Sequence, residues 1–235
     1  MLPYVPPPVI SLGTLHIHVF SLCAAAAILA ARAIILGRAR RLGVRDDEAR
    51  ILFLVSLLAC IAGGAAHAWY AGEAGVCSFG AVLGASAGAA LVCFLRRYSW
   101  EKTELQLDMA AFAVPFAACL GRAGCALAHD HRGVRSDGWL AVRFPEGSQY
   151  DLGLLDFVFL LALSAAFLQL DRRRRPPLFF LGLAAASYGA FRCWRESLDP
   201  LPHPLPWAAV CSAGIVAVTM AIWKTKQESA ARAIV

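Results

Sequence analysis

A charged side chain within an apolar stretch is the most unusual chemical feature of this sequence. Arg122 lies inside the run Met109–Ala128, flanked by Gly121 and Gly124. An arginine at the centre of a membrane-spanning helix costs about 2.5–3.5 kcal/mol by insertion scales, which makes it a candidate functional residue. The glycines carry no side chain, so backbone or ligand can come close to the guanidinium. Because a guanidinium binds phosphate through two parallel hydrogen bonds, we expect Arg122 to bind an anion, and lipid phosphate is the abundant anion of a bilayer.

A second polar group closes a later apolar run, at residues 178–194. Tyr188 and Arg192 lie near its end, and Glu196 follows Arg192 by four residues. Residues four apart share one face of a helix, so Arg192 and Glu196 are expected side by side. Two arginines on different helices could hold one phosphodiester while its acyl chains stay among the helices. The alternative is that Arg192 only positions its helix through the pair with Glu196.

Three histidines and one aspartate could carry out proton transfer. His129, Asp130 and His131 directly follow the run that contains Arg122, and His67 closes another apolar run. Histidine titrates near neutral pH and can act as a general base, and an adjacent aspartate can fix its tautomer. His67 could instead be a hydrogen-bonding residue at the membrane interface. Alternate residues give poor metal geometry and no further ligand is evident, so the sequence predicts no metal.

The composition places these residues in a membrane protein. Of the 235 residues 59% are hydrophobic and 16% are charged, whereas a soluble domain carries roughly 25% charged residues. Apolar stretches of about the length that crosses a bilayer as a helix recur seven times. The sequence therefore predicts an all-α polytopic fold, a single transmembrane domain over residues 1–235, with about seven helices at 15–36, 50–71, 78–95, 107–128, 152–170, 178–194 and 206–223.

Small residues are frequent in these stretches. Gly80, Gly84 and Gly88 follow one another at intervals of four residues, a pattern typical of close helix packing rather than of a phosphate loop. The eight cysteines form no Cys-x-x-Cys pair and fall mostly within the apolar stretches. We interpret them as small apolar packing residues.

The basic residues indicate the topology. The net charge is +6, and lysines and arginines gather after the first, third, fifth and seventh stretches. By the positive-inside rule the N-terminus is predicted outside and the C-terminus in the cytoplasm. This pattern explains the charge without a nucleic-acid partner, and it puts the arginine and histidine motifs near the outer leaflet. The Pro-rich start lacks a basic segment, so the first stretch is not expected to be a cleaved signal peptide. The alternate loops hold only Arg132, Arg135, Arg143 and Arg195.

Two motifs in the right order resemble the bacterial prolipoprotein diacylglyceryl transferase family. Gly121-Arg122-Ala123-Gly124, with Gly133 at the closing position, resembles the signature GRxGNFxNxE and its final glycine. Tyr188-Gly189, Phe191-Arg192 and Glu196 resemble the family's YGxFRxxxE stretch. The segment Ile10–Ile17 is similar to the family's approach to its first span. Seven spans with an outward N-terminus are also the family's topology.

Several family positions differ in this chain. The signature asparagines fall at Cys125 and Ala128, and the glutamate is shortened to Asp130. The His-Gly-Gly motif reads Phe79-Gly80-Ala81, so the histidine commonly proposed as base is absent. In addition, the tyrosine of the first span becomes Phe20, and the HPxQLYE segment is eroded to residues 150–156.

The resemblance implies an enzyme that moves a diacylglyceryl group from phosphatidylglycerol to the thiol of a lipobox cysteine in an exported lipoprotein precursor. It implies location in the bacterial cytoplasmic membrane, with the site toward the outer leaflet. The leaving phosphate needs stabilisation of negative charge, and the thiol must lose its proton because the thiolate is the nucleophile. No cofactor is implied. The expected phosphate-binding residues are Arg122, Arg192, Gly121, Gly124, Tyr188 and Glu196, and the expected catalytic residues are His129, Asp130, His131 and His67.

Three alternatives remain open at this stage. A family paralogue could use the same lipid site on a different acceptor. A non-catalytic lipid-binding or scaffold protein could have kept the arginines and lost the chemistry. A transporter is the third, but the sequence has no inverted-repeat pattern to support it.

Overall fold

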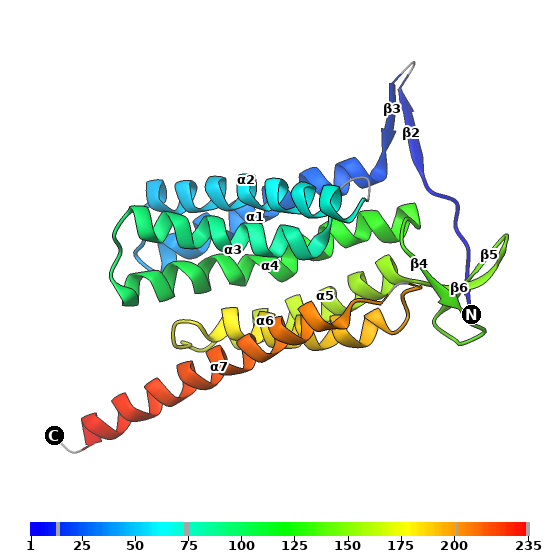
Figure 1. Cartoon of the computed structure of the whole chain (residues 1–235). Coiled ribbons are helices and arrows are strands. Elements are labelled where there is room, and N and C mark those ends of the chain that lie inside the picture. Colours follow the sequence, from blue (N-terminus) through cyan, green and yellow to red (C-terminus); the bar gives the residue numbers. More distant parts are fainter. Residues whose placement is uncertain (13–14, 73–75, 201, 234–235) are drawn as a thin grey trace. The chain divides into compact units, whose positions relative to one another are not determined.

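The computed structural model describes residues 1–12, 15–72, 76–200 and 202–233, and this part of the chain is mostly helical (Figure 1). Six of the seven helices described are long and apolar enough to cross a membrane. The exception is α6, which carries Arg192, Arg195 and Glu196. The predicted all-α polytopic membrane fold is confirmed, whereas the sides on which the termini lie stay a prediction. The helices are α1 (Val19–Arg41), α2 (Asp46–Ala71), α3 (Ser78–Leu95), α4 (Trp100–Ala128), α5 (Leu152–Leu170), α6 (Phe179–Glu196) and α7 (Pro204–Ala233).

The predicted helix boundaries hold for α3 and α5 and differ elsewhere. The first helix does not begin at residue 15, because Leu15–His18 forms strand β3, paired antiparallel with β2 (Val9–Leu12). Residues 15–18 alternate apolar and polar types, which is the period of a strand, and α1 starts only at Val19. At the other end, α7 continues past residue 223 into a polar segment. The extension is rich in good helix formers such as alanine, lysine and glutamine.

The contacts within the chain divide it into two compact groups. The first group comprises Met1–Ala30, Val114–Arg174 and Ala184–Ile215, and the second comprises Ala31–Ala113, Arg175–Leu183 and Val216–Val235.

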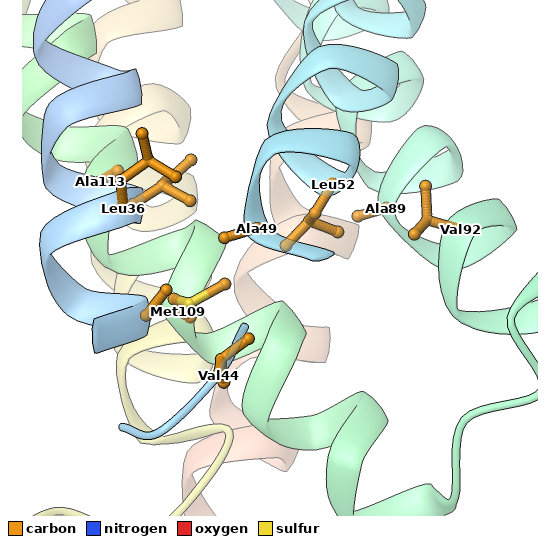
Figure 2. Close-up of a cluster of buried hydrophobic side chains, with 10 residues drawn as sticks. Leu36, Val44, Ala49, Leu52, Ala89, Val92, Met109 and Ala113 are labelled. Atoms are coloured by element: carbon orange, nitrogen blue, oxygen red, sulfur yellow. The ribbon is translucent and has the colours of Figure 1, made fainter. Parts of the chain in front are cut away.

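The second group has an aliphatic core drawn from α1, α2, α3 and α4. Figure 2 shows Leu36, Leu52, Val92 and Met109 among the side chains of this cluster. In the same group the Asp108 carboxylate accepts hydrogen bonds from the backbone N–H groups of Phe180 and Leu181, at 2.7 and 3.0 Å. These N–H groups begin α6, so the buried carboxylate is stabilised by a helix N-terminus.

Glycines allow α2 and α3 to approach closely. A methyl group at Gly80 would collide with the backbone carbonyl of Gly63, and one at Gly84 would collide with that of Ala59. The interpretation of the glycine series as a packing surface is therefore confirmed. The close contacts at these glycines fix the spacing of α2 and α3.

A small sheet belongs to the first group and replaces most of the loop expected at 129–151. Its strand order is β1 (Leu2–Pro3), β5 (Ala141–Phe144), β6 (Gly147–Asp151) and β4 (Arg132–Arg135). The chain passes from α4 into β4 and from β6 into α5 (Figure 1). Two backbone hydrogen bonds tie the sheet to the helices, from Leu152 N to His131 O and from Val134 N to Leu198 O, both at 2.9 Å. The sheet thus fixes the ends of α4, α5 and α6 that carry the candidate site.

Candidate active site

A single carboxylate gathers three arginines in the first group. Asp156 on α5 is fully buried, with 0% of its surface exposed. Its Oδ2 lies 3.1 Å from Arg122 Nε and 3.4 Å from Arg192 Nη1, and its Oδ1 lies 3.8 Å from Arg195 Nε. Arg122 comes from α4 and the other two arginines come from α6. We call these residues, together with Glu196, the arginine cluster.

Glu196 completes the cluster from the end of α6. Its Oε1 accepts hydrogen bonds from Arg192 Nη2 at 2.7 Å and Arg195 Nη1 at 3.4 Å, and its Oε2 accepts one from the backbone N–H of His203 at 3.0 Å. The guanidinium of Arg192 also lies 4.4 Å from the centre of the Trp207 ring. Packing and ion pairing together therefore hold Arg192 in one orientation.

Two members of the cluster were missed by sequence reasoning. Arg195 was expected in a loop, but α6 extends to Glu196, and Arg195 is only 4% exposed. Asp156 was given no role, although a carboxylate within the apolar stretch 152–170 is the same kind of signal as Arg122. The pairing itself could not be inferred, because it depends on which faces of three helices meet.

Two hydrogen-bond donors of the arginine cluster have no acceptor in the part of the chain that the structure describes. Among the described residues, Arg192 Nε and Arg195 Nε have no hydrogen-bond acceptor, and both atoms are buried. Leaving a buried charged donor without an acceptor is costly. Three guanidinium groups face two buried carboxylates, while a third carboxylate, Asp199, pairs with Arg195 at 2.9 Å from a position 27% exposed. Counting only the two buried carboxylates, the three guanidinium groups exceed them by one positive charge. A bound monoanion would balance that charge.

The remaining predicted binding residues lie close to the cluster but differ in their surroundings. Tyr188 interacts electrostatically with Arg122 and packs edge-on against Trp207, with ring centres 5.5 Å apart. Space around Gly121 is open, since a methyl group there would meet nothing within 4 Å. Gly124 instead allows α4 to pack against α1, because a methyl group would come within 3.0 Å of Cys23 and 3.1 Å of Phe20.

His129 is built into the support of the sheet. Its Nδ1 lies 2.5 Å from Asp151 Oδ2, and its Nε2 lies 2.9 Å from the backbone carbonyl of Val5. Tyr4 and Phe144 lie against its ring, with centres 5.1 and 5.3 Å away. Both ring nitrogens of His129 therefore face acceptors within the protein.

Beyond His129 the chain turns back toward the last turns of α4. The backbone of His129 has φ of +51°, the left-handed conformation that ends many helices and reverses the chain. Asp130 and His131 thereby approach Cys125, and one polar atom of each residue lies within 4.8 Å of the others. We call these three residues the Cys-Asp-His group.

The Cys-Asp-His group adjoins the arginine cluster. Cys125 Sγ lies 3.9 Å from Arg122 Nη1, and His131 Nε2 lies 3.9 Å from Asp130 Oδ1. Partial burial and the positive charge of Arg122 lower the pKa of His131, while the Asp130 carboxylate opposes that change. Cys125 is buried, whereas the side chains of Asp130 and His131 are 39% and 46% exposed.

His67 belongs to the second group, on α2. Its Nδ1 is buried and has no hydrogen bond among the described residues, and its ring meets Phe79 edge-on with centres 5.8 Å apart. A catalytic role for His67 stays a prediction.

Comparison with known proteins identifies the family of this chain. The sequence profile of the family described as prolipoprotein diacylglyceryl transferase matches residues 7–225. No curated protein matches the chain significantly. The match covers nearly the whole chain, including all the residues of the arginine cluster and of the Cys-Asp-His group. The chain therefore belongs to the prolipoprotein diacylglyceryl transferase family, membrane-embedded transferases of lipoprotein maturation.

Proposed function

We propose that this protein transfers the diacylglyceryl group of phosphatidylglycerol to the lipobox cysteine of exported lipoprotein precursors, at the outer leaflet of the bacterial cytoplasmic membrane. The observation that carries the proposal is the arginine cluster, in which two Nε–H groups have no hydrogen-bond acceptor among the described residues and three guanidinium groups face two buried carboxylates. A phosphodiester brings one negative charge and several acceptor oxygens, so it can balance the excess positive charge and accept hydrogen bonds from the two Nε–H groups.

The reaction moves charge toward the arginines. The acceptor thiolate attacks the glycerol carbon of the diacylglyceryl group that is bonded to a phosphate oxygen. A C–S bond forms, and the bond between that carbon and the phosphate oxygen breaks, with its electron pair going to the phosphate. Glycerol phosphate then carries a second negative charge that the donor lipid did not have. Guanidinium groups fixed in advance therefore stabilise the transition state more than the bound lipid.

Asp156 and Glu196 serve this step as positioning residues. A buried carboxylate between three guanidinium groups lets them stay close together when no phosphate is bound. Glu196 fixes the orientation of Arg192 and Arg195 through hydrogen bonds to both.

For the acceptor thiol we propose the side of the site formed by Asp130 and His131. Both side chains are partly exposed and lie next to Arg122, whereas both nitrogens of His129 face other acceptors. The thiol and the phosphate would then be held on adjoining parts of one helix end.

The test is a reconstituted transfer assay with labelled phosphatidylglycerol and a lipobox peptide. Arg122→Lys keeps the charge but loses the planar two-point grip, and Arg122→Ala loses both. Loss of one such transition-state contact costs about 10²–10³ in rate, so we expect Arg122→Ala to fall by that amount and Arg122→Lys by less. The matched control is Arg45→Lys, whose side chain is 74% exposed and pairs with Asp47. Undiminished transfer in Arg122→Ala would overturn the proposal.

A second candidate is a family member that uses the same donor on another acceptor. It is favoured by Phe79, Cys125 and Ala128, which stand where the family motif has histidine and asparagines. In the same assay, water or a small thiol in place of the peptide would then receive the diacylglyceryl group while the lipobox peptide would not.

A further inference from the structure

The Cys-Asp-His group has the composition of a catalytic zinc site. Thiolate, imidazole and carboxylate are the three donor types that bind Zn²⁺, and three protein ligands with one open position distinguish catalytic from structural zinc. Cys125, Asp130 and His131 supply one donor of each type, and they are the only such group among the residues that the structure describes. Cys125 lies about one helical turn before residues 129–131, so the spacing within that short segment does not reveal it.

The distances suit a tetrahedral ion. The three donor atoms lie within 4.8 Å of one another. Zinc–ligand bonds of about 2.0–2.3 Å place tetrahedral donors roughly 3.3–3.8 Å apart. The Asp130 and His131 side chains are 39% and 46% exposed, so small rotations about their side-chain bonds can close the remaining gap. The same exposure leaves the fourth position open to an incoming ligand.

The surroundings of Cys125 argue against a packing role alone. Its sulfur lies 3.9 Å from the Arg122 guanidinium and beside the polar atoms of Asp130 and His131, rather than among apolar side chains only. The thiolate is the form of cysteine that binds metal, so metal binding at this site would displace the Cys125 proton. With Cys125 as thiolate and Asp130 as carboxylate, the two ligand charges cancel those of Zn²⁺, so the occupied site is neutral before a fourth ligand binds.

We propose that Cys125, Asp130 and His131 bind a Zn²⁺ ion whose fourth ligand is the thiol of the acceptor cysteine. This inference rests on the proposed function and assigns its thiol-activating group. A thiol that coordinates zinc is deprotonated outright, with its proton passing to solvent. The metal-bound sulfur then attacks the diacylglyceryl carbon, and the electron pair of the broken C–O bond leaves with the phosphate. The thioether product is neutral and a weaker ligand, so it dissociates.

The arrangement also accounts for a chain with Phe79 at the position of the family histidine. If the metal removes the thiol proton, no separate histidine base is needed. The acceptor sulfur would be held one helical turn from Arg122, because Cys125 follows it by three residues on α4.

The first test is zinc binding by the full-length protein in detergent, measured by elemental analysis after equilibrium dialysis. We expect one zinc per chain, and at least a 100-fold loss of affinity in Cys125→Ser and in Asp130→Asn. Asp130→Asn changes a partly exposed residue, so it tests the site even if Cys125→Ser does not fold. The matched control is Cys119→Ser, on the same helix and equally buried but outside the group, which should bind zinc like the wild type. Absence of stoichiometric zinc in the wild type, or equal binding by all variants, overturns the proposal.

The second test follows the acceptor. In protein loaded with Co²⁺, a lipobox peptide should increase the thiolate-to-metal charge-transfer absorption, and the same peptide with serine for cysteine should not. An unchanged spectrum overturns the assignment of the thiol as fourth ligand. Metal binding is scored without transfer, so a cobalt response without transferred lipid would refute the donor reaction and support the site. Transfer without any bound metal would refute the site and support the donor reaction.

Discussion

Replacing Asp156 by asparagine keeps the size of the side chain and removes its charge. The carboxylate is fully buried and lies 3.1, 3.4 and 3.8 Å from guanidinium nitrogens of three arginines. With Glu196 left as the only buried counter-charge, the excess in the cluster rises from one positive charge to two. Breaking a buried ion pair by removing one partner costs about 3–5 kcal/mol, a large part of a typical folding free energy of about 5–15 kcal/mol.

The assay is unfolding by SDS in mixed micelles, followed by tryptophan fluorescence. We expect Asp156→Asn to lose about 3–5 kcal/mol of unfolding free energy. The exposed Asp137→Asn, in the segment between β4 and β5, should remain within about 0.5 kcal/mol of the wild type. Transfer in Asp156→Asn should fall because the arginines lose their common anchor.

Added phosphatidylglycerol separates this explanation from simple loss of packing. Its single negative charge can take the place of the missing carboxylate, so it should stabilise Asp156→Asn more than the wild type, whereas uncharged diacylglycerol should not. Equal stabilisation of both proteins by phosphatidylglycerol, or unchanged stability of the variant, would refute the charge argument.

Three further outcomes are expected. His129→Ala should lose about 1–3 kcal/mol of unfolding free energy, because the contacts of its ring with Asp151 and Val5 are removed, and hydrogen exchange in β4–β6 should become faster. Transfer should continue in this variant, whereas His131→Ala should abolish it. The reverse result would exchange the roles of the two histidines. Gly80→Ala should destabilise the protein in SDS titration by about 1–3 kcal/mol through its clash with α2, while Gly37→Ala, which meets nothing within 4 Å, should be neutral or stabilising; equal effects would contradict the packing argument. Arg195→Lys should raise the KM for phosphatidylglycerol in transfer kinetics, because Arg195 Nε is one of the two buried donors without a hydrogen-bond acceptor among the described residues, and an unchanged KM would exclude it from donor binding.

Charge in apolar sequence was the signal that could be read without a structure. Arg122 and Arg192 stand out because an unpaired guanidinium is costly in a bilayer, so their presence requires a partner. The same argument applied to Asp156 would have identified the third member of the site. Arg195 was misplaced because the apolar pattern weakens toward residue 196 and the helix end could not be located from hydropathy.

The sheet and the two histidine environments were less accessible. Strand β1 pairs with β5 across more than a hundred residues of sequence, and no local pattern specifies such pairing. The pairings of β6 with β5 and with β4 join segments within residues 132–151. His129 and His131 lie on either side of Asp130 in the sequence, but the left-handed backbone at His129 sends one ring toward Asp151 and places the other beside Asp130.

The sequence by itself determined the membrane fold, the approximate positions of the helices, the family and two of the three arginines, because hydrophobic length, small-residue spacing and a rare intramembrane charge are local properties. Only the tertiary structure decided that Asp156 holds three arginines together, that both ring nitrogens of His129 contact acceptors of the protein and that Cys125 meets Asp130 and His131. Those contacts depend on how helix faces and chain reversals bring distant side chains within a few ångströms, and that geometry is set by packing of the whole chain.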